Sequence, residues 1–452
     1  MRTLFNFQSK TITSAAIVLA GSSLISRILG LFRDRLLAST FGANSELDVY
    51  YAAFRIPDFI YGILIAGGII VAFLPLLSEY FLENKETAWK FINNILNVFL
   101  FFLIFISLGL FIFAPVITKL ITPGFTPQQL ATTVLLTRIL SLSPILLGVS
   151  SIFSGILQYF HKFLAYGLAP IFYNLGIILG IVFLAPYSGV LGVAVGVIIG
   201  AFLHLAVQVP SAIFSGFKYQ PIFDLKAPGL KRVLFLMIPR TFAVFSLQSN
   251  YVVMTAIAST LAVGSITVFN LANNIQHFPS GIVGVSFATA AFPSLSRFWA
   301  GEKKNEFIKS LSSAIRKIIY VVLPISFLMF ILRNQIVEII FRQGEFTEAS
   351  AHLTASALGL FAIGVLPFSM VPLLSRAFFS FQDTRTPTLI TLATVSLNIA
   401  LSVYFVGLLK PQDSAVLGLP LAFSLASIFS FFTLMFFLCR RIGFSWLKKI
   451  LF

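Results

Sequence analysis

Long apolar stretches recur along the chain, and short polar connections separate them. An α-helix needs about 20 apolar residues to cross the hydrocarbon core of a bilayer. Twelve stretches reach that length, near residues 13–37, 47–80, 91–121, 129–158, 165–184, 189–214, 230–258, 264–297, 310–340, 350–380, 387–409 and 415–439. The pattern predicts an all-α polytopic membrane protein with about 12 transmembrane helices. Their even number places both termini on one side of the membrane.

The composition agrees with this prediction. Of the 452 residues, 58% are apolar and 10% are charged, whereas a soluble domain carries about 25% charged residues. A soluble enzyme, a disordered chain and a coiled coil are therefore excluded. Cys439 is the single cysteine, which excludes a disulfide framework and a thiolate metal site. The four histidines are too scattered to suggest a metal site, so we expect neither a metal nor a cofactor.

The positive charge is distributed unevenly between the loops. The chain has 31 Lys and Arg against 15 Asp and Glu, a net charge of +16. Loops on the side of the termini hold 21 of these cations, whereas the opposite loops hold three, Lys119, Arg342 and Lys410. Because short cytoplasmic loops carry an excess of Lys and Arg, both termini are predicted to be cytoplasmic. This cytoplasmic bias accounts for most of the net positive charge. We therefore expect no nucleic-acid partner.

One sequence pattern occurs twice. Gln158 and Asn174 frame the connection between the fourth and fifth spans, and Gln382 and Asn398 frame the one between the tenth and eleventh. Both pairs are 16 residues apart, and the copies are offset by 382 − 158 = 224 residues. The chain therefore contains an internal repeat.

The repeat predicts two parallel six-helix halves, residues 1–218 and 230–452, joined by a cytoplasmic linker at 219–229. Because the repeat unit has an even number of spans, the halves relate by an axis along the membrane normal. Two such halves around a central cavity are typical of a transporter.

A tandem small-residue motif occurs in the sixth span. Gly192, Gly196 and Gly200 repeat every four residues and so share one helix face. Such a face lets two helix backbones approach closely, so we interpret it as a packing surface.

Seven cations are not assigned to loops, since 31 − 21 − 3 = 7. All are arginines inside or at the edge of spans: Arg27, Arg33, Arg35, Arg55, Arg138, Arg240 and Arg333. An arginine at the bilayer centre costs about 2.5–3.5 kcal/mol on insertion scales, so it usually faces a bundle interior or a wet cavity.

Two interpretations of these arginines compete. In the first, they are paired locally, as Arg33 with Asp34 or Arg55 with Asp58, or they extend to the interface. We prefer this for Arg35, Arg138 and Arg333. In the second, Arg27, Arg55 and Arg240 face a cationic cavity, because deep carboxylates are too few to neutralise them. Arginine binds phosphate oxygens in pairs, so such a cavity predicts an anionic substrate.

The chain resembles the MurJ/MviN family in several segments whose order and spacing are specific. They are Ser26–Asp34, Phe41–Phe59, Ala72–Tyr80, Leu157–Gly180, Phe278–Arg297, Phe341–Ser350 and Leu373–Thr388. The family comprises lipid II flippases of bacterial peptidoglycan synthesis, within the multidrug/oligosaccharidyl-lipid/polysaccharide exporter superfamily. The resemblance implies an undecaprenyl-pyrophosphate-linked disaccharide-pentapeptide, moved from the inner to the outer leaflet of the bacterial cytoplasmic membrane.

The resemblance also implies residue roles. Arg27, Arg33, Asp48 and Arg55 fall on positions where the family has charged cavity residues. The first, second, seventh and eighth spans would line that cavity. The implied protein is a monomeric transporter and not an enzyme, with lipid II or a related lipid as its partner.

Some positions depart from the family pattern. An arginine and a glutamate of the second span are replaced by Tyr61 and Ala66. An arginine and a nearby glutamate of the eighth span are replaced by Asn274 and His277, which we retain as candidate substrate-binding residues. We hypothesise that Arg240 replaces the lost cation.

The sodium site of some members uses Asn-x-x-x-Asp on the eleventh span, where this chain has Asn398 and Ser402. The resemblance therefore does not imply sodium-coupled transport for this chain.

A lipid II flippase is the leading prediction. A flippase for another undecaprenyl-linked oligosaccharide, of the O-antigen or teichoic type, is the alternative. A multidrug cation exporter is a third reading, but it would need buried carboxylates without neighbouring arginines.

Overall fold

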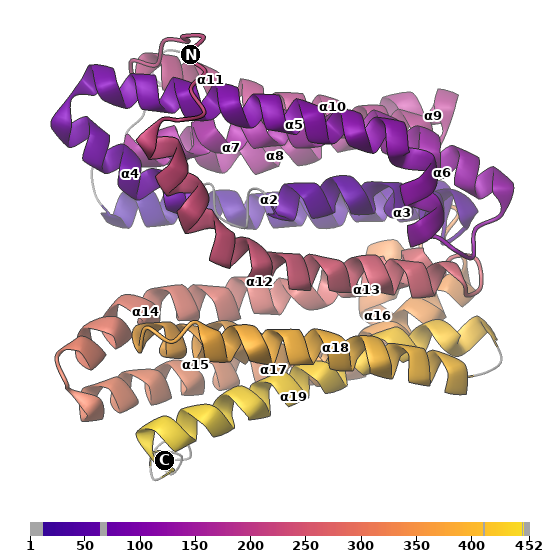
Figure 1. The fold of residues 1–452 in the computed structure, drawn as a ribbon. Coiled ribbons are helices and arrows are strands. Elements are labelled where there is room, and N and C mark those ends of the chain that lie inside the picture. The colour runs from indigo at the N-terminus through magenta and orange to yellow at the C-terminus, as the bar shows by residue number, and fades with distance from the viewer. Residues whose placement is uncertain (1–11, 64–69, 410–411, 445, 447–452) are drawn as a thin grey trace. The chain divides into compact units, whose positions relative to one another are not determined.

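The computed structural model describes residues 12–63, 70–409, 412–444 and 446, and the described part is helical without strands. In chain order the helices are α2 (Ile12–Phe41), α3 (Ser45–Tyr61), α4 (Ile70–Glu83), α5 (Lys85–Ile121), α6 (Pro127–Leu140), α7 (Ser143–Tyr159), α8 (Phe163–Leu179), α9 (Ala185–Ser188), α10 (Val190–Ala206), α11 (Val209–Phe214), α12 (Pro228–Ser259), α13 (Ser265–Pro279), α14 (Val285–Ala300), α15 (Lys304–Ile331), α16 (Arg333–Phe341), α17 (Glu348–Ser380), α18 (Arg385–Leu408) and α19 (Gly418–Ile442) (Figure 1). Short π-helical segments, η2 (Gly180–Leu184) and η3 (Ser280–Gly284), continue α8 and α13, and a 3-10 turn, η4 (Gln412–Leu417), precedes α19.

The helices confirm the predicted all-α membrane fold. Within the described residues, nine helical segments are long and apolar enough to cross a bilayer. They coincide with nine of the twelve predicted spans. The first, second and seventh predicted spans coincide with α2, with α3 and α4 together, and with α12.

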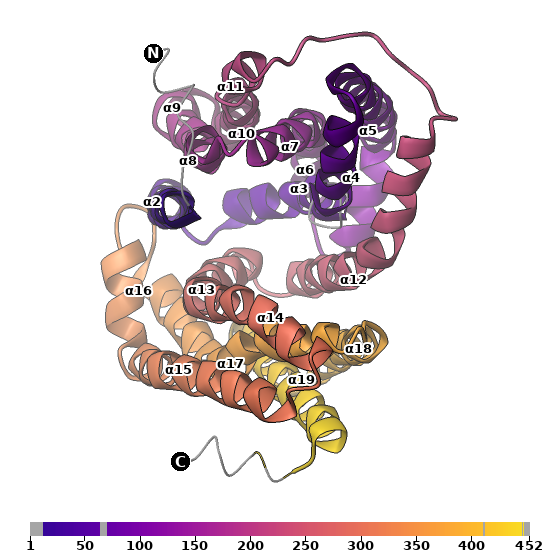
Figure 2. The same cartoon turned by 90° about the vertical axis from the view of Figure 1, so that its left-hand side faces the viewer.

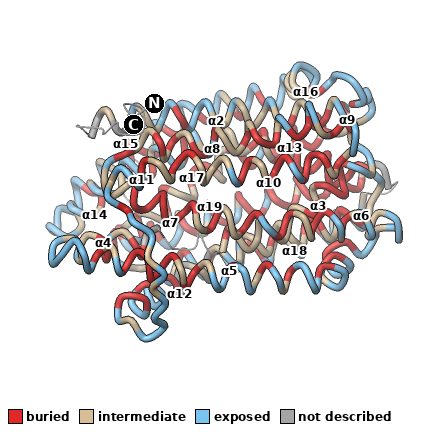
Figure 3. Tube along the Cα trace, turned by 90° about the horizontal axis from the view of Figure 1, so that it is seen from above, coloured by how far each residue is buried: buried red, intermediate tan, exposed pale blue. Residues whose placement is uncertain are grey.

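Many large apolar side chains lie on the outside of the helices. On α5, Phe101, Phe105 and Phe113 are more than half exposed, whereas Ile92, Ile95 and other residues of the opposite face are buried. Figure 3 shows the same change between exposed and buried positions along several helices. A water-soluble monomer rarely exposes contiguous apolar surface on this scale, so these faces suit contact with lipid.

Packing divides the chain into two units. The first contains the residues up to Ala256 except 42–44, and the second contains 42–44 and the residues from Ile257 onward. Most of α12 therefore belongs with the first unit, where its Phe245 packs edge-on against Phe59 of α3 at 5.5 Å. The predicted linker at 219–229 instead divides the chain according to its sequence repeat. That division into two halves stays a prediction.

The first unit has two buried clusters. One joins α4, α5, α7 and the start of α12, with Phe73, Ile92 and Ile156 fully buried. The other joins the end of α2 to α3, α6 and α10. In the second unit, α17 packs against α13, α14, α15, α16 and α19 (Figure 2).

The glycine repeat of α10 is a packing surface, as predicted. A Cβ atom on Gly196 would lie 2.6 Å from the Cα of Gly180, and one on Gly200 would collide with the carbonyl oxygen of Tyr173. Only glycine allows this approach, so α10 lies directly against α8 and η2.

Two helix-ending turns have the same local geometry. His161, after α7, and Gln382, after α17, have positive φ angles of 55° and 59°. In each turn the next N–H bonds back five residues, Lys162 to Leu157 O at 2.8 Å and Asp383 to Phe378 O at 3.1 Å.

Candidate functional site

Arg33 lies on α2 and is paired with its neighbour. Its Nε and Nη2 donate to Asp34 Oδ1 at 3.0 and 2.7 Å. The Asp34 side chain is only 3% exposed, against 23% for Arg33. The local pairing considered for Arg33 is therefore present, and one buried carboxylate partly neutralises this cation.

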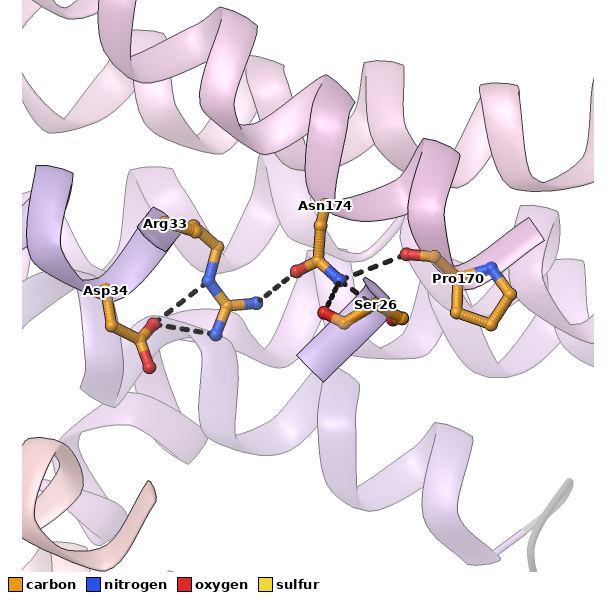
Figure 4. Close-up of polar contacts among 5 residues, drawn as sticks. All are labelled: Ser26, Arg33, Asp34, Pro170 and Asn174. Atoms are coloured by element: carbon orange, nitrogen blue, oxygen red, sulfur yellow. Dashed lines mark hydrogen bonds and ion pairs between the residues drawn. The ribbon is translucent and has the colours of Figure 1, made fainter. Parts of the chain in front are cut away.

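Asn174 of α8 forms a hydrogen bond with the Arg33 guanidinium. Its Oδ1 accepts a hydrogen bond from Arg33 Nη1 at 3.1 Å, and its Nδ2 donates to Pro170 O at 3.0 Å and to Ser26 O and Oγ at 3.3 Å (Figure 4). A guanidinium has five N–H groups. Three are used by Asp34 and Asn174, so within the described residues two remain for a ligand.

Arg55 of α3 reaches α12. Its Nε donates to Thr255 Oγ1 at 3.0 Å, and its guanidinium carbon lies 5.7 Å from the centre of the Tyr251 ring. The Thr255 hydroxyl in turn donates to Tyr251 O at 2.9 Å. These two contacts are to uncharged groups, and they orient the guanidinium toward α12.

Arg27 lies six residues before Arg33 on α2. It lines a pocket of about 380 Å³, together with residues of α3, α7, α8 and α10. Arg33 does not line this pocket. The two arginines therefore face different surroundings, although Ser26 both lines the pocket and receives the Asn174 hydrogen bond.

Asp48 is buried in the first turn of α3, with 3% of its surface exposed. The partial positive charge of a helix N-terminus favours a carboxylate there. Arg240 lies in α12, but its side chain is outside the described residues, as is Ala66.

Asn274 and His277 lie on α13, in the second unit. The imidazole of His277 packs edge-on against Phe368 of α17, with the ring centres 5.1 Å apart. Asn398 and Ser402 are buried on α18. No group of three or more His, Cys, Asp or Glu that could hold a metal ion occurs among the described residues.

Two further intramembrane arginines, Arg138 and Arg333, contact their surroundings locally. Arg138 Nε donates to Phe111 O at 3.2 Å, and Arg333 Nη1 donates to Phe330 O at 2.8 Å. Each guanidinium also lies 5.3 Å from the ring centre of the same phenylalanine. These contacts agree with the local role preferred for both residues.

Sequence reasoning missed the polar partners of the arginines. Asn174 and Thr255 are separated from Arg33 and Arg55 by 141 and 200 residues. It also missed a buried network in which Gln208 of the α10–α11 connection bonds Ser150 and Ser154. The one available signal was the clustering of serines at four-residue spacing, as at Ser150 and Ser154, within otherwise apolar spans.

Comparison with known proteins identifies the family. The family model described as "Lipid II flippase MurJ" matches residues 37–452. The chain belongs to the lipid II flippase MurJ family. A "Probable lipid II flippase MurJ" of Buchnera aphidicola subsp. Acyrthosiphon pisum is 33% identical over 381 residues, covering 83% of this chain and 75% of that protein. The "Lipid II flippase MurJ" of Burkholderia cenocepacia is 28% identical over 393 residues, covering 84% and 76%.

Solved structures agree with the MurJ assignment. One described as "Lipid II flippase MurJ, inward closed conformation" has a TM-score of 0.81 and 26% identity, covering 96% of this chain and 92% of that chain. An inward-facing multidrug resistance transporter of the MATE family has a TM-score of 0.73 at 18% identity. The second likeness shows the fold alone. The MurJ family and the apolar helices together establish a multi-pass protein of the bacterial inner membrane.

Proposed function

We propose that this protein is a flippase that moves lipid II from the inner to the outer leaflet of the cytoplasmic membrane. The names of the MurJ relatives support this cargo. The observation that carries the proposal is the set of arginines on α2 and α3. Arg27, Arg33 and Arg55 lie in predicted spans, and Asp34 is the carboxylate that pairs with one of them.

The chemistry of these arginines suits a pyrophosphate. A planar guanidinium binds phosphate oxygens through two parallel N–H bonds, and it stays charged inside a membrane. In our proposal Arg27, Arg33 and Arg55 bind the anionic headgroup. The proposal also assigns substrate binding to Asp48, Arg240, Asn274 and His277.

We further propose alternating access by rocking of two six-helix halves, with both termini cytoplasmic and a monomer as the working unit. The protein would perform no covalent chemistry. An inside-negative potential favours outward movement of an anion by about 2.3 kcal/mol per charge per 100 mV, so it would assist release of the headgroup outside.

Depletion of the endogenous lipid II flippase in a bacterial host, with this chain expressed from a plasmid, tests the proposal. Accessibility of lipid II at the outer leaflet is the readout. We expect the wild type to restore it and Arg33→Ala to lose most of the activity. Arg138→Ala is the matched control, because Arg138 also lies in a span but bonds a backbone carbonyl and a ring.

Retention of lipid II on the inside by a folded, membrane-inserted wild type would refute the proposal. If the protein instead translocates another undecaprenyl-linked oligosaccharide in parallel assays, the alternative cargo holds. A cation exporter would need cationic substrates, which Arg27, Arg33 and Arg55 would repel.

A further inference from the structure

A polar pocket lies inside the first unit. Its volume is about 380 Å³, within the range of about 300–1,000 Å³ typical of ligand sites. Its walls include Ser22 and Arg27 of α2, Tyr61 of α3, Ser154 of α7, Tyr166 of α8 and His204 of α10. Ser23, which is exposed, also lines it, so the pocket is not closed off.

One wall is held by a complete hydrogen-bond network. Ser154 Oγ donates to Gln208 Oε1 at 2.8 Å, and Gln208 Nε2 donates to Ser150 Oγ at 2.6 Å. Ser150 Oγ lies 2.7 Å from His204 Nδ1. Gln208 and Ser150 are fully buried, so this network fixes the wall that Ser154 and His204 present to the pocket.

The described polar groups on the opposite side of the pocket are not held by such a hydrogen-bond network. Among the described residues, the guanidinium of Arg27 and the hydroxyls of Ser22, Tyr61 and Tyr166 have no hydrogen-bond partner, although all four residues line the pocket. Ser22 is 8% exposed. A ligand with matching acceptors would give these groups the hydrogen bonds that the described part of the protein does not supply.

These groups indicate the ligand class. One cation, several hydroxyls and two aromatic rings suit a ring that carries many oxygen acceptors and lies beside an acidic group. A bare phosphate would use the cation but would leave most of the hydroxyls without a partner. The chemistry is that of a sugar joined to a phosphate.

Asn174 links the pocket wall to Arg33 through hydrogen bonds. Ser26 and Pro170 line the pocket, and both accept hydrogen bonds from the Asn174 amide that contacts Arg33 on its other side (Figure 4). The Asn174 side chain therefore stands between the pocket wall and the guanidinium that the proposed function assigns to the phosphate.

We propose that this pocket binds a sugar ring of the lipid-linked headgroup, beside the pyrophosphate held by the arginines. The proposal rests on the flippase function proposed above. Tyr61 gives it a feature particular to this chain, because the family resemblance leads us to expect an arginine at that position.

The test compares lipid II with undecaprenyl pyrophosphate, which has the same lipid and pyrophosphate but no sugar or peptide. The wild type and a Ser22→Ala/Tyr61→Phe/Tyr166→Phe variant are placed in lipid nanodiscs, and binding of lipid II and of undecaprenyl pyrophosphate is measured by native mass spectrometry. Because these hydroxyls have no partner in the protein, their removal should leave folding intact. Tyr159→Phe is the matched control, since Tyr159 stacks on Phe81 outside the pocket.

Each lost hydrogen bond is expected to weaken lipid II binding by about 2- to 10-fold, so the triple variant should lose about tenfold or more. Its binding of undecaprenyl pyrophosphate should change by less than about twofold, and Tyr159→Phe should match the wild type. Equal loss for both lipids, or no loss for lipid II, would overturn the sugar site. Failure of the wild type to bind either lipid would instead refute the proposed function.

Discussion

Arg33 Nη1 donates to Asn174 Oδ1 at 3.1 Å, so a residue of α8 sets the direction of a cation on α2. The same cation is paired with Asp34 on its own helix. Asp34 therefore occupies N–H groups that an anionic headgroup would also use. In the proposed function the carboxylate competes with the substrate, which would keep binding reversible.

The first prediction concerns the charge around Arg33. Asp34→Asn leaves the cation without its carboxylate, so thermal stability without ligand should fall, because breaking a buried ion pair is strongly destabilising. Addition of undecaprenyl pyrophosphate should then raise the melting temperature by more than it does in the wild type. Asn174→Asp adds a second carboxylate and should shrink this ligand-induced shift. Equal shifts in all three proteins would show that Asp34 does not compete.

The second prediction concerns Arg55. Thr255→Val keeps the shape of the side chain but removes the acceptor of the Arg55 Nε hydrogen bond. A buried donor without its partner costs about 1–3 kcal/mol, so stability should fall by that amount. Thermal unfolding in detergent measures it. Thr255→Ser retains the hydroxyl and should recover most of the lost stability. If Thr255→Ser is as unstable as Thr255→Val, the loss comes from packing and not from the hydrogen bond.

The third prediction concerns the close contact of α8 with α10. Gly196→Ala places a Cβ 2.6 Å from the Cα of Gly180, so the backbones must separate. Overpacking of this kind typically costs about 1–3 kcal/mol. Gly109→Ala on α5 is the control, because no atom lies within 4 Å of its added Cβ. Unfolding temperatures should fall for the first variant and stay level or rise slightly for the second.

The fourth prediction concerns the loop between α11 and α12. Asn94 of α5 binds both backbone groups of Asp224, since its Nδ2 donates to the carbonyl at 2.9 Å and its Oδ1 accepts from the N–H at 2.6 Å. Asn94→Ala removes both bonds, so trypsin should cut after Lys226 several times faster. Asn84→Ala removes only the cap of α5 at Glu86 and should leave the rate unchanged. A similar acceleration in both variants would indicate general loosening of α5.

The fifth prediction concerns Asp383, in the turn between α17 and α18. Burial raises the pKa of this carboxyl, but hydrogen bonds from the Thr386 N–H and hydroxyl and the charge of Arg441 outweigh it, so the pKa lies below its ordinary value. A carboxyl with a lowered folded-state pKa stabilises the fold above its unfolded-state pKa of about 3.9. That stabilisation disappears as the pH falls through the folded-state pKa.

Asp383→Asn should therefore unfold at a lower temperature than the wild type at pH 7. The difference should shrink as the pH is lowered from about 4 toward 3. Melting curves of both proteins across this range measure it. A difference that is constant with pH would show that the carboxylate charge has no part in the stabilisation.

The sequence alone determined which segments cross the membrane. A span needs only length and apolar composition, and these are local properties that the segment retains in any arrangement. The same holds for the glycines of α10, because a face of small residues at four-residue spacing is a property of one helix. The intramembrane cost of arginine likewise marked Arg27, Arg33 and Arg55 as unusual without reference to their neighbours.

Only the tertiary structure decided what those arginines contact. Spacing along α2 and α3 fixes the face on which each lies, but not which helix lies opposite. Asn174 and Thr255 are distant in sequence and meet Arg33 and Arg55 through the packing of α8 and α12. Helix packing also separates Arg27 from Arg33. Arg27 lines a pocket with several hydroxyl groups, whereas Arg33 contacts Asp34 and Asn174. Polar contacts between helices depend on distances that arise only when apolar faces pack.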